Sequence, residues 1–332
     1  MSFGSGACSA IKGALASRGR PYAIFAFALL FGAACLLVFG VATAQAPGAP
    51  PQGSPLADEE PITAIPPPPA ADPLKVALGE QLFGDRRLSH NGNFACLSCH
   101  DTRTNGTSSD KPSPNHLRPP SVFDAALSFR LNWEGNFRTL EAHTESSLEN
   151  PANLATSASE VVEKLKADPE MTRRFSDAYG RLPDRASLLD AIATYVRSLR
   201  TPGSRFDLWL GGDASALSLE ELEGYRLFKS YGCVSCHQGV NVGGNLFERH
   251  GIFRPLASPK PEILRVPSLR NVATRPPYFH DGSAPTLGDA VRKMAAAQLD
   301  RTLSDQQLEA IVAFLKTLTG NYRGAVVAGP PS

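Results

Sequence analysis

The chain has 332 residues, a length typical of two domains, and 42% of them are hydrophobic, which is sufficient for packed cores. Its formal net charge is +1, from 33 basic and 32 acidic residues. No block of basic residues indicates a nucleic-acid partner, so the composition argues against that class of function.

Residues 1–46 are typical of an export signal. A basic n-region from Lys12 to Arg20 precedes an uncharged run of 20 residues at 22–41, and Ala42-Thr43-Ala44 resembles a cleavage site. The run is just long enough to span a bilayer. A cleaved signal peptide and an uncleaved membrane anchor therefore both remain open, with cleavage preferred, and either one predicts an exported protein.

Residues 47–73 contain ten prolines, a composition that predicts a semi-extended, disordered linker. The globular body is expected to begin near residue 74. We divide it into an N-terminal domain at 74–215, a C-terminal domain at 216–320 and a tail at 321–332.

Helical patterns dominate the body, and the predicted fold class is mostly α. Ser157-Ala-Ser-Glu160 has capping-box spacing and begins a helix that Asp168-Pro169 ends, while apolar periodicity predicts another helix over 187–199. Ser218 and Ser304 are expected to cap two further helices. The body has no long run of alternating strand residues.

Two C-x-x-C-H motifs, at 96–100 and 233–237, carry the chemistry of the chain. In this pattern the two thiols add to the vinyl groups of one heme c, and the adjacent His is an axial ligand of the iron. Structural zinc is the alternative, but the other cysteines, Cys8 and Cys35, lie in the export segment. The predicted attachment residues are Cys96, Cys99, Cys233 and Cys236, with His100 and His237 as proximal ligands.

A G-x-x-L-F sequence precedes each heme motif, at 79–83 and again at 224–228. Small c-type cytochromes begin with a short helix that leads into C-x-x-C-H, so this repeat in register with the heme motifs favours an internal duplication. We therefore expect two cytochrome c-like domains, each with its own heme.

The sixth ligands of the two irons are less certain from spacing alone. Met294 lies 57 residues after His237 and is open between an axial ligand and a core residue, whereas Met171 is expected to be a packing residue. His116 lies sixteen residues after His100 in a loop rich in Ser, Pro and Asn. It is open between a ligand that can leave the iron and a solvated side chain.

Ordered motifs over residues 74 to 320 resemble those of the bacterial diheme cytochrome c peroxidases. Besides the first heme motif they are Leu78-Gly-Glu-Gln-Leu-Phe83, Asp85-Arg-Arg-Leu-Ser89, Ser121-Val-Phe-Asp-Ala-Ala126, Phe206-Asp-Leu-Trp-Leu210, Val266-Pro-Ser-Leu-Arg-Asn-Val272, Pro277-Tyr-Phe-His-Asp-Gly282 and Ala310-Ile-Val-Ala-Phe-Leu-Lys316. The resemblance implies two helical cytochrome c-like domains, with a low-potential peroxidatic heme in the first and a high-potential, electron-storing heme in the second.

The resemblance also implies roles for single residues. In the family a Met fourteen residues after the His of F-H-D-G ligates the C-terminal heme, and the residue fourteen after His280 is Met294. His116 corresponds to the loop His that leaves the peroxidatic iron on activation, although its loop is shorter than the family's. Trp133 corresponds to a Trp between the two hemes, which implies an electron relay.

Two positions depart from the family in the peroxide pocket. The family has a Gln ten residues after this Trp and a Glu twenty residues after it, where this chain has His143 and Asn153. The amide of Asn153 cannot titrate. His143, with a reference pKa of about 6.5, could act as a general acid or base, and a packing or solvated His143 is the alternative.

The resemblance further implies a calcium ion between the domains and a homodimer. Arg118 lies near the expected position of an Asn ligand, although Arg275 and Pro277 could still offer backbone carbonyl groups, so calcium binding is an open prediction.

The leading hypothesis is a periplasmic peroxidase that reduces hydrogen peroxide to water with electrons from a small reduced cytochrome c or cupredoxin. One alternative is a diheme oxidase that modifies residues of a partner protein; Met294 argues against its closest known version, which has Tyr there, and loss of the pocket Glu favours it. The other alternative is a non-catalytic diheme electron carrier.

Overall fold

The computed structural model describes residues 60–107, 117–256 and 261–330. The expected export segment and His116 lie outside these ranges. None of the described helices is long and apolar enough to cross a membrane. All described residues belong to one compact unit.

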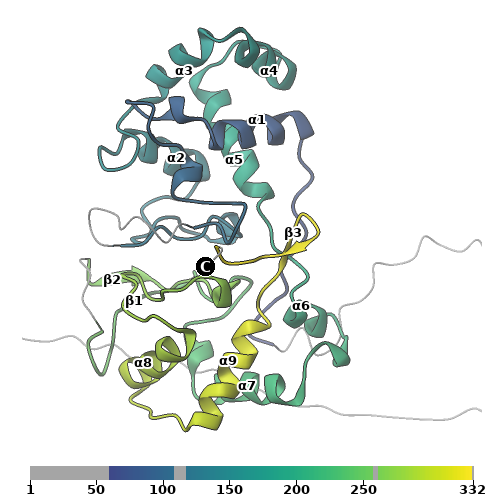
Figure 1. Ribbon diagram of the computed structural model, residues 1–332, viewed down its shortest axis with the longest axis vertical. Helices are drawn as coiled ribbons and strands as arrows, with labels where there is room; N and C mark the ends of the chain where they lie inside the picture. Colours follow the sequence, from purple (N-terminus) through teal and green to yellow (C-terminus); the bar gives the residue numbers. More distant parts are fainter. Residues whose placement is uncertain (1–59, 108–116, 257–260, 331–332) are drawn as a thin grey trace, which may run out of the picture. The chain divides into compact units, whose positions relative to one another are not determined.

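The fold is mostly helical, as predicted, with four short strands in the described residues (Figure 1). The α-helices are α1 (Pro73–Phe83), α2 (Leu140–Glu149), α3 (Ala158–Lys166), α4 (Pro169–Tyr179), α5 (Arg185–Ser198), α6 (Arg205–Leu210), α7 (Leu219–Ser230), α8 (Leu287–Leu299) and α9 (Asp305–Lys316). Single 3-10 turns are η1 (Arg86–Leu88), η2 (Cys96–Ser98), η3 (Ala125–Leu127), η4 (Ala214–Ala216), η5 (Cys233–Ser235) and η6 (Val272–Thr274). The strands form two antiparallel pairs, β1 (Phe247–Arg249) with β2 (Ile263–Arg265), and β3 (Asn321–Tyr322) with β4 (Ala325–Val326).

Local capping explains where the predicted helices begin. The side chain of Ser157 accepts a hydrogen bond from the backbone N–H of Glu160 at the start of α3. Ser218 and Ser304 form complete capping boxes before α7 and α9. Asp168 both follows the end of α3 and caps α4, whose first residue is a proline. These helices are confirmed.

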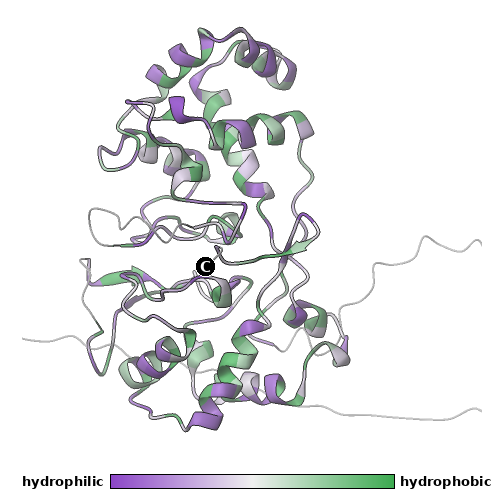
Figure 2. Ribbon diagram, viewed as in Figure 1, coloured by the Kyte–Doolittle hydropathy of each residue, from purple (hydrophilic) through white to green (hydrophobic). Residues whose placement is uncertain are grey.

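The helices surround two apolar cores, and most of them show both polar and apolar faces (Figure 2). The first core lies among α1 to α5 and includes Leu78, Leu82, Val161, Leu165, Met171, Phe175, Leu188, Ile192 and Tyr195. The second lies among α6, α7, α8 and α9 and includes Phe206, Leu210, Tyr225, Phe228, Ile311, Phe314 and Leu315. Met171 is 0% exposed, which confirms that it is a packing residue.

The boundary between the cores falls before the expected one at residue 215. Leu199 packs in the first core, whereas Phe206 and Leu210 of α6 pack in the second. The ring centroid of Phe206 lies 4.8 Å from that of Tyr225 on α7 and 5.2 Å from that of Phe314 on α9. By packing, α6 therefore belongs with the C-terminal helices.

The repeated G-x-x-L-F sequence marks the same helix crossing in both halves. A Cβ atom on Gly79 of α1 would lie 2.0 Å from the carbonyl oxygen of Ala191 on α5, and one on Gly224 of α7 would lie 1.9 Å from that of Ala310 on α9. Only glycine permits this close approach of the two backbones. The pairs α1/α5 and α7/α9 are thus structural repeats, as the sequence repeat indicated.

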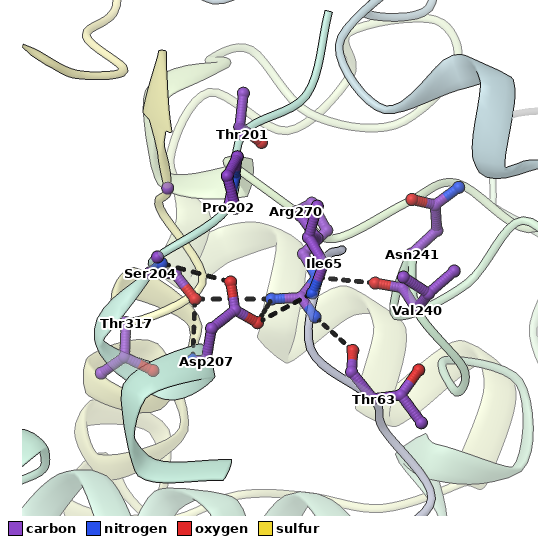
Figure 3. Close-up of polar contacts among 12 residues, drawn as sticks. Thr63, Ile65, Thr201, Pro202, Ser204, Asp207, Val240, Asn241, Arg270 and Thr317 are labelled. Carbon is purple, nitrogen blue, oxygen red and sulfur yellow. Dashed lines mark hydrogen bonds and ion pairs between the residues drawn. The ribbon is translucent and has the colours of Figure 1, made fainter. Parts of the chain in front are cut away.

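Residues 60–72 differ from the solvated spacer expected for this part of the chain. Ile62 is 0% exposed and packs in the second core, and Ile65 is 5% exposed. The guanidinium of Arg270 donates to the carbonyl of Thr63 at 2.7 Å and to Asp207 at 2.8 Å (Figure 3). The prolines exclude helix but leave apolar residues and carbonyl groups free to pack, so this segment is part of the body.

The C-terminal tail returns to the first half of the chain. The β3/β4 hairpin places Tyr322 against Phe123, with ring centroids 4.9 Å apart. Val327 is 5% exposed and belongs to the first core. The tail therefore connects the C-terminal helices with the N-terminal core.

Candidate heme sites

The C-terminal heme motif forms a compact turn at the end of α7. The backbone N–H of His237 donates to the carbonyl of Cys233 at 3.0 Å, and both cysteines and His237 line one cavity. His237 Nδ1 lies 3.2 Å from the carbonyl oxygen of Val242. This contact orients the ring and leaves Nε2 for a metal, as the outer contacts of metal-binding histidines usually do.

The N-terminal motif repeats this geometry after α1. His100 N–H donates to the carbonyl of Cys96 at 2.9 Å, and the ring of Phe83 lies 6.5 Å from that of His100. The matching distance from Phe228 to His237 is 6.4 Å. Within the described residues, His100 Nδ1 is buried without a well-formed hydrogen bond. A buried polar ring without a complete set of partners is consistent with a site that a ligand completes.

Burial sets the protonation of both motifs. It lowers the pKa of His100 and of His237 to about 4, so both imidazoles are neutral at pH 7, the form that binds iron. Burial also raises the pKa of the Cys96 thiol to about 12 and that of Cys233 to about 11. Protonated thiols in apolar surroundings do not favour zinc, which binds thiolate.

The chemistry of the donor set fits heme c better than zinc. No cluster of three or more His, Cys, Asp or Glu side chains that could hold a metal ion is present in the described parts of the chain. The thiols of Cys233 and Cys236 instead line an apolar cavity together with His237 and, from α8, Met294. Residues of α7 and α9 complete that cavity, among them Phe228, Ile311 and Leu315.

The same cavity extends to the N-terminal half of the chain. Trp133 lines it, and its indole Nε1 donates to the carbonyl of Arg118 at 2.9 Å. The ring of Trp133 meets that of His280 edge-on at 4.4 Å, and Pro120, beside the His100 imidazole, also lines the cavity. Trp133 therefore lies where the two halves of the chain meet at the cavity.

Comparison with known proteins identifies both halves. A family described as Di-haem cytochrome c peroxidase matches residues 73–215, and one described as Cytochrome c matches residues 222–319. The chain is 38% identical to the cytochrome c551 peroxidase of Nitrosomonas europaea over 74% of its length and 79% of that protein. It belongs to the bacterial diheme cytochrome c peroxidase family.

Two further relatives place the chain within this family. The methylamine utilization protein MauG of Methylorubrum extorquens is 30% identical, over 76% of this chain and 81% of that protein. The crystal structure of a MauG-like protein associated with microbial copper homeostasis superposes with a TM-score of 0.66 at 26% identity, over 77% of this chain and 94% of that one. As a member of the family the chain is an oxidoreductase with two covalently bound c-type hemes.

His143, expected in the peroxide pocket, lies on α2 with its ring 5.3 Å from that of Phe137. Burial, and to a smaller extent its proximity to His100 and Arg265, lower its pKa to about 4. The reference value of about 6.5 therefore does not apply, and His143 is neutral at pH 7.

Asn153, expected in the same pocket, is exposed in the turn after α2, where its backbone N–H donates to the carbonyl of Asn150 at 2.9 Å. In the described residues no hydrogen bond joins its side chain to His143 or His100. His143 therefore lies close enough to His100 for the two rings to influence each other's protonation, whereas Asn153 lies at the surface.

The calcium prediction does not fit these residues. The guanidinium of Arg118 donates a hydrogen bond to the carbonyl of Pro277, one of the groups expected to bind the ion. The guanidinium of Arg275 donates to the carbonyls of Ser268 and Arg270 at 2.7 Å. Burial, and to a smaller extent the positive charge of Arg118, lower the pKa of Arg275 to about 10. A calcium ion needs anionic groups or free carbonyl oxygens as ligands. At the expected position the positively charged side chains of Arg118 and Arg275 are present, and they already donate to carbonyl groups.

Sequence reasoning missed two contributors to this region. Arg265 lies across the Trp133 ring, with its guanidinium carbon 5.5 Å from the ring centroid. His250 Nε2 lies 3.4 Å from Nδ1 of His280. Arg265 directly precedes the Val266-to-Val272 motif, which was the one signal that could have pointed to it; nothing in the sequence indicated His250.

Proposed function

We propose that the protein is a peroxidase that reduces hydrogen peroxide at the N-terminal heme site. Two electrons and two protons convert one peroxide molecule to two water molecules. The electrons enter one at a time through the C-terminal heme site, from a small reduced cytochrome c or cupredoxin. The proposed location is the periplasm, because covalent attachment of heme c in bacteria follows export, and a homodimer remains part of the proposal.

The asymmetry of the two heme sites is the observation that carries this proposal. His237 and Met294 line one cavity, which supports a six-coordinate, high-potential iron that stores an electron. The described residues around His100 offer no comparable sulfur ligand, because Met171 is fully buried in the apolar core. A heme without a permanent second protein ligand is what peroxide binding requires.

The chain's own residues supply the remaining parts of the reaction. His100, Cys96 and Cys99 would hold the heme, which when bound would supply the redox chemistry for cleavage of the O–O bond. His143 is neutral at pH 7, since its pKa is lowered to about 4, so its ring can accept a proton from bound peroxide and pass it to the departing oxygen. Trp133 lies on the cavity of the other heme, where an aromatic ring can relay electrons.

A stopped-flow experiment tests the proposal. The holoprotein, with the C-terminal heme reduced and the N-terminal heme oxidised, is mixed with hydrogen peroxide, with and without a reduced small cytochrome c. We expect rapid oxidation of the reduced heme with one equivalent of peroxide, and continued turnover only when the donor is present. No oxidation of the reduced heme by peroxide would instead support a diheme electron carrier.

A protein-modifying oxidase is the second candidate. Asn153 supports it, since the position that holds a titratable Glu in the peroxidases carries an exposed amide here. Met294 supports the peroxidase, because a Met ligand makes the C-terminal heme an electron store. Peroxide consumption that depends on a partner protein, with covalent change of that partner and no turnover with reduced cytochrome, would favour the oxidase.

A further inference from the structure

Five arginines line the cavity that contains the C-terminal heme motif, and two of them, Arg249 and Arg301, are exposed. The other three, Arg118, Arg265 and Arg275, we call the arginine cluster. Arg265 is 7% exposed, and the other two are partly buried. The cluster lies where the N-terminal half meets the cavity, because the backbone carbonyl of Arg118 accepts the Trp133 indole hydrogen bond and the Arg265 guanidinium lies across the Trp133 ring.

No carboxylate forms an ion pair with any member of the cluster among the residues that the structure describes. The guanidinium of Arg265 donates to the Asn132 carbonyl at 3.1 Å and to Ser128 Oγ at 3.3 Å, both neutral. The guanidiniums of Arg118 and Arg275 donate only to backbone carbonyls, and Arg275 Nε is buried without an acceptor.

Arg270 is a buried arginine of this fold that does have a carboxylate partner. Its guanidinium contacts Asp207 at 2.8 Å, and both side chains are almost fully buried (Figure 3). The arginine cluster lacks such a partner, and burial lowers the pKa of Arg265 and of Arg275 to about 10. Burying unpaired positive charges around one cavity is unfavourable unless an anion joins them.

Heme c brings two carboxylates, its propionates, and arginine is the residue best suited to bind carboxylates because its donors form a planar fork. The thioether bonds fix the vinyl side of the porphyrin at Cys233 and Cys236. The propionates leave the porphyrin on its other side, and the arginine cluster faces the same cavity from elements other than η5.

We propose that the arginine cluster binds the propionates of the C-terminal heme and, through this positive charge, raises that heme's reduction potential. The inference depends on heme attachment and not on the identity of the substrate. It also explains why the expected calcium position carries arginine: the positive charge needed beside the propionates is built into the chain.

The test uses the exported holoprotein and follows each heme by spectroelectrochemical titration. In Arg265→Gln we expect the equilibrium constant for reduction of the high-potential heme to fall about tenfold, which is 59 mV for a one-electron couple. Arg265→Lys keeps the charge and should change it by less than about threefold. Arg249→Gln is the matched control, because Arg249 also lines the cavity but is exposed and lies 3.4 Å from Glu262; it should leave the potential unchanged.

A second readout observes the carboxylates directly. Redox-difference infrared spectra of protein whose heme carries ¹³C in the propionate carboxyl groups should show bands that shift in Arg265→Gln and not in Arg249→Gln. Heme content is measured first, and if Arg265→Gln does not retain heme, Arg118→Gln is the variant that decides. An unchanged potential together with unshifted propionate bands in the deciding variant would overturn the proposal.

Discussion

At the scale of single residues, burial determines which side chains of the two heme sites can do chemistry. His100, His143 and His237 all have a pKa lowered to about 4, chiefly because they are desolvated. Each is therefore a neutral ring at physiological pH. For His100 and His237, the predicted proximal ligands, this favours metal binding, and for His143 it makes the ring a proton acceptor.

His143→Gln should slow cleavage of peroxide by about 10²–10⁴-fold if His143 transfers the proton. The heme spectra should not change, since α2 and the heme motifs are separate elements. Stopped-flow mixing with peroxide measures the rate, and Asn153→Gln, at the exposed neighbouring position, is the control. A His143→Gln protein as fast as wild type would move proton delivery to water and add weight to the protein-modifying oxidase.

The pH dependence of the same step follows from the direction of the shift. The active form of His143 is neutral, and a pKa lowered to about 4 keeps it neutral above that value. The rate should therefore be flat from about pH 6 to pH 8 and fall as the pH approaches 4, where the ring gains a proton. A midpoint near 6.5, the reference value, would contradict the buried environment.

Met294→His should lower the reduction potential of the C-terminal heme by on the order of 0.1 V, because axial ligands tune heme potentials over roughly 0.8 V. The reason is that the Met thioether favours the ferrous iron more than an imidazole does. Redox titration measures this, and Met171→Leu, in the apolar core, is the control that should leave both potentials in place. Two indistinguishable potentials in the wild type would speak against the ligand assignment.

At the scale of elements, the duplication rests on two glycine-mediated helix crossings. The backbones of α7 and α9 touch at Gly224 and Ala310, as those of α1 and α5 touch at Gly79 and Ala191. The Phe that ends each G-x-x-L-F sequence then lies near the His of the C-x-x-C-H motif in its own half, with ring centroids 6.5 Å and 6.4 Å apart. One short sequence therefore contributes both to the crossing of the helices and to the surroundings of the motif His.

Gly224→Ala should destabilise the protein by about 1–3 kcal/mol or more, because the added Cβ meets backbone atoms that cannot move without separating α7 from α9. Gly288→Ala in α8 is the matched control. Its Cβ would find only ordinary contacts at 3.8 Å, so no loss of stability is expected. Denaturant unfolding of both holoproteins compares them, and equal stabilities would contradict the close crossing.

At the scale of the whole molecule, segments from both ends of the described chain connect the two cores. Ile62 enters the C-terminal core, while Val327 enters the N-terminal core. Arg270 joins three stretches far apart in sequence, through the Thr63 carbonyl, Asp207 and the Val240 carbonyl. The cavity and the arginine cluster lie where the halves meet, so the spacing of the two heme sites depends on these connections.

Ile62→Ala should lower the free energy of unfolding by about 2–5 kcal/mol, since Ile62 is fully buried and its loss leaves a cavity in the second core. Ile252→Ala is the control, because Ile252 is 59% exposed and should change stability by no more than about 0.5 kcal/mol. Thermal or denaturant unfolding measures both. A neutral Ile62→Ala would indicate that residues 60–72 are a spacer after all.

The sequence by itself determined the features that depend on local chemistry. A C-x-x-C-H motif contains in five residues all that attaches one heme, and Ser157, Ser218 and Ser304 cap the helices that follow them because the capping contact spans only three residues. The G-x-x-L-F repeat could be recognised for the same reason. The mostly α fold follows from these local signals.

Only the tertiary structure decided what depends on contacts between distant residues. The pKa of His143 reflects burial that no neighbour in sequence reveals, and the packing of Ile62 requires a core built more than 140 residues later. The arginine cluster gathers residues 118, 265 and 275 around one cavity, so their shared positive charge exists only in the folded chain. Burial and electrostatic interactions depend on distances between residues in three dimensions, and the spacing of residues along the sequence does not give those distances.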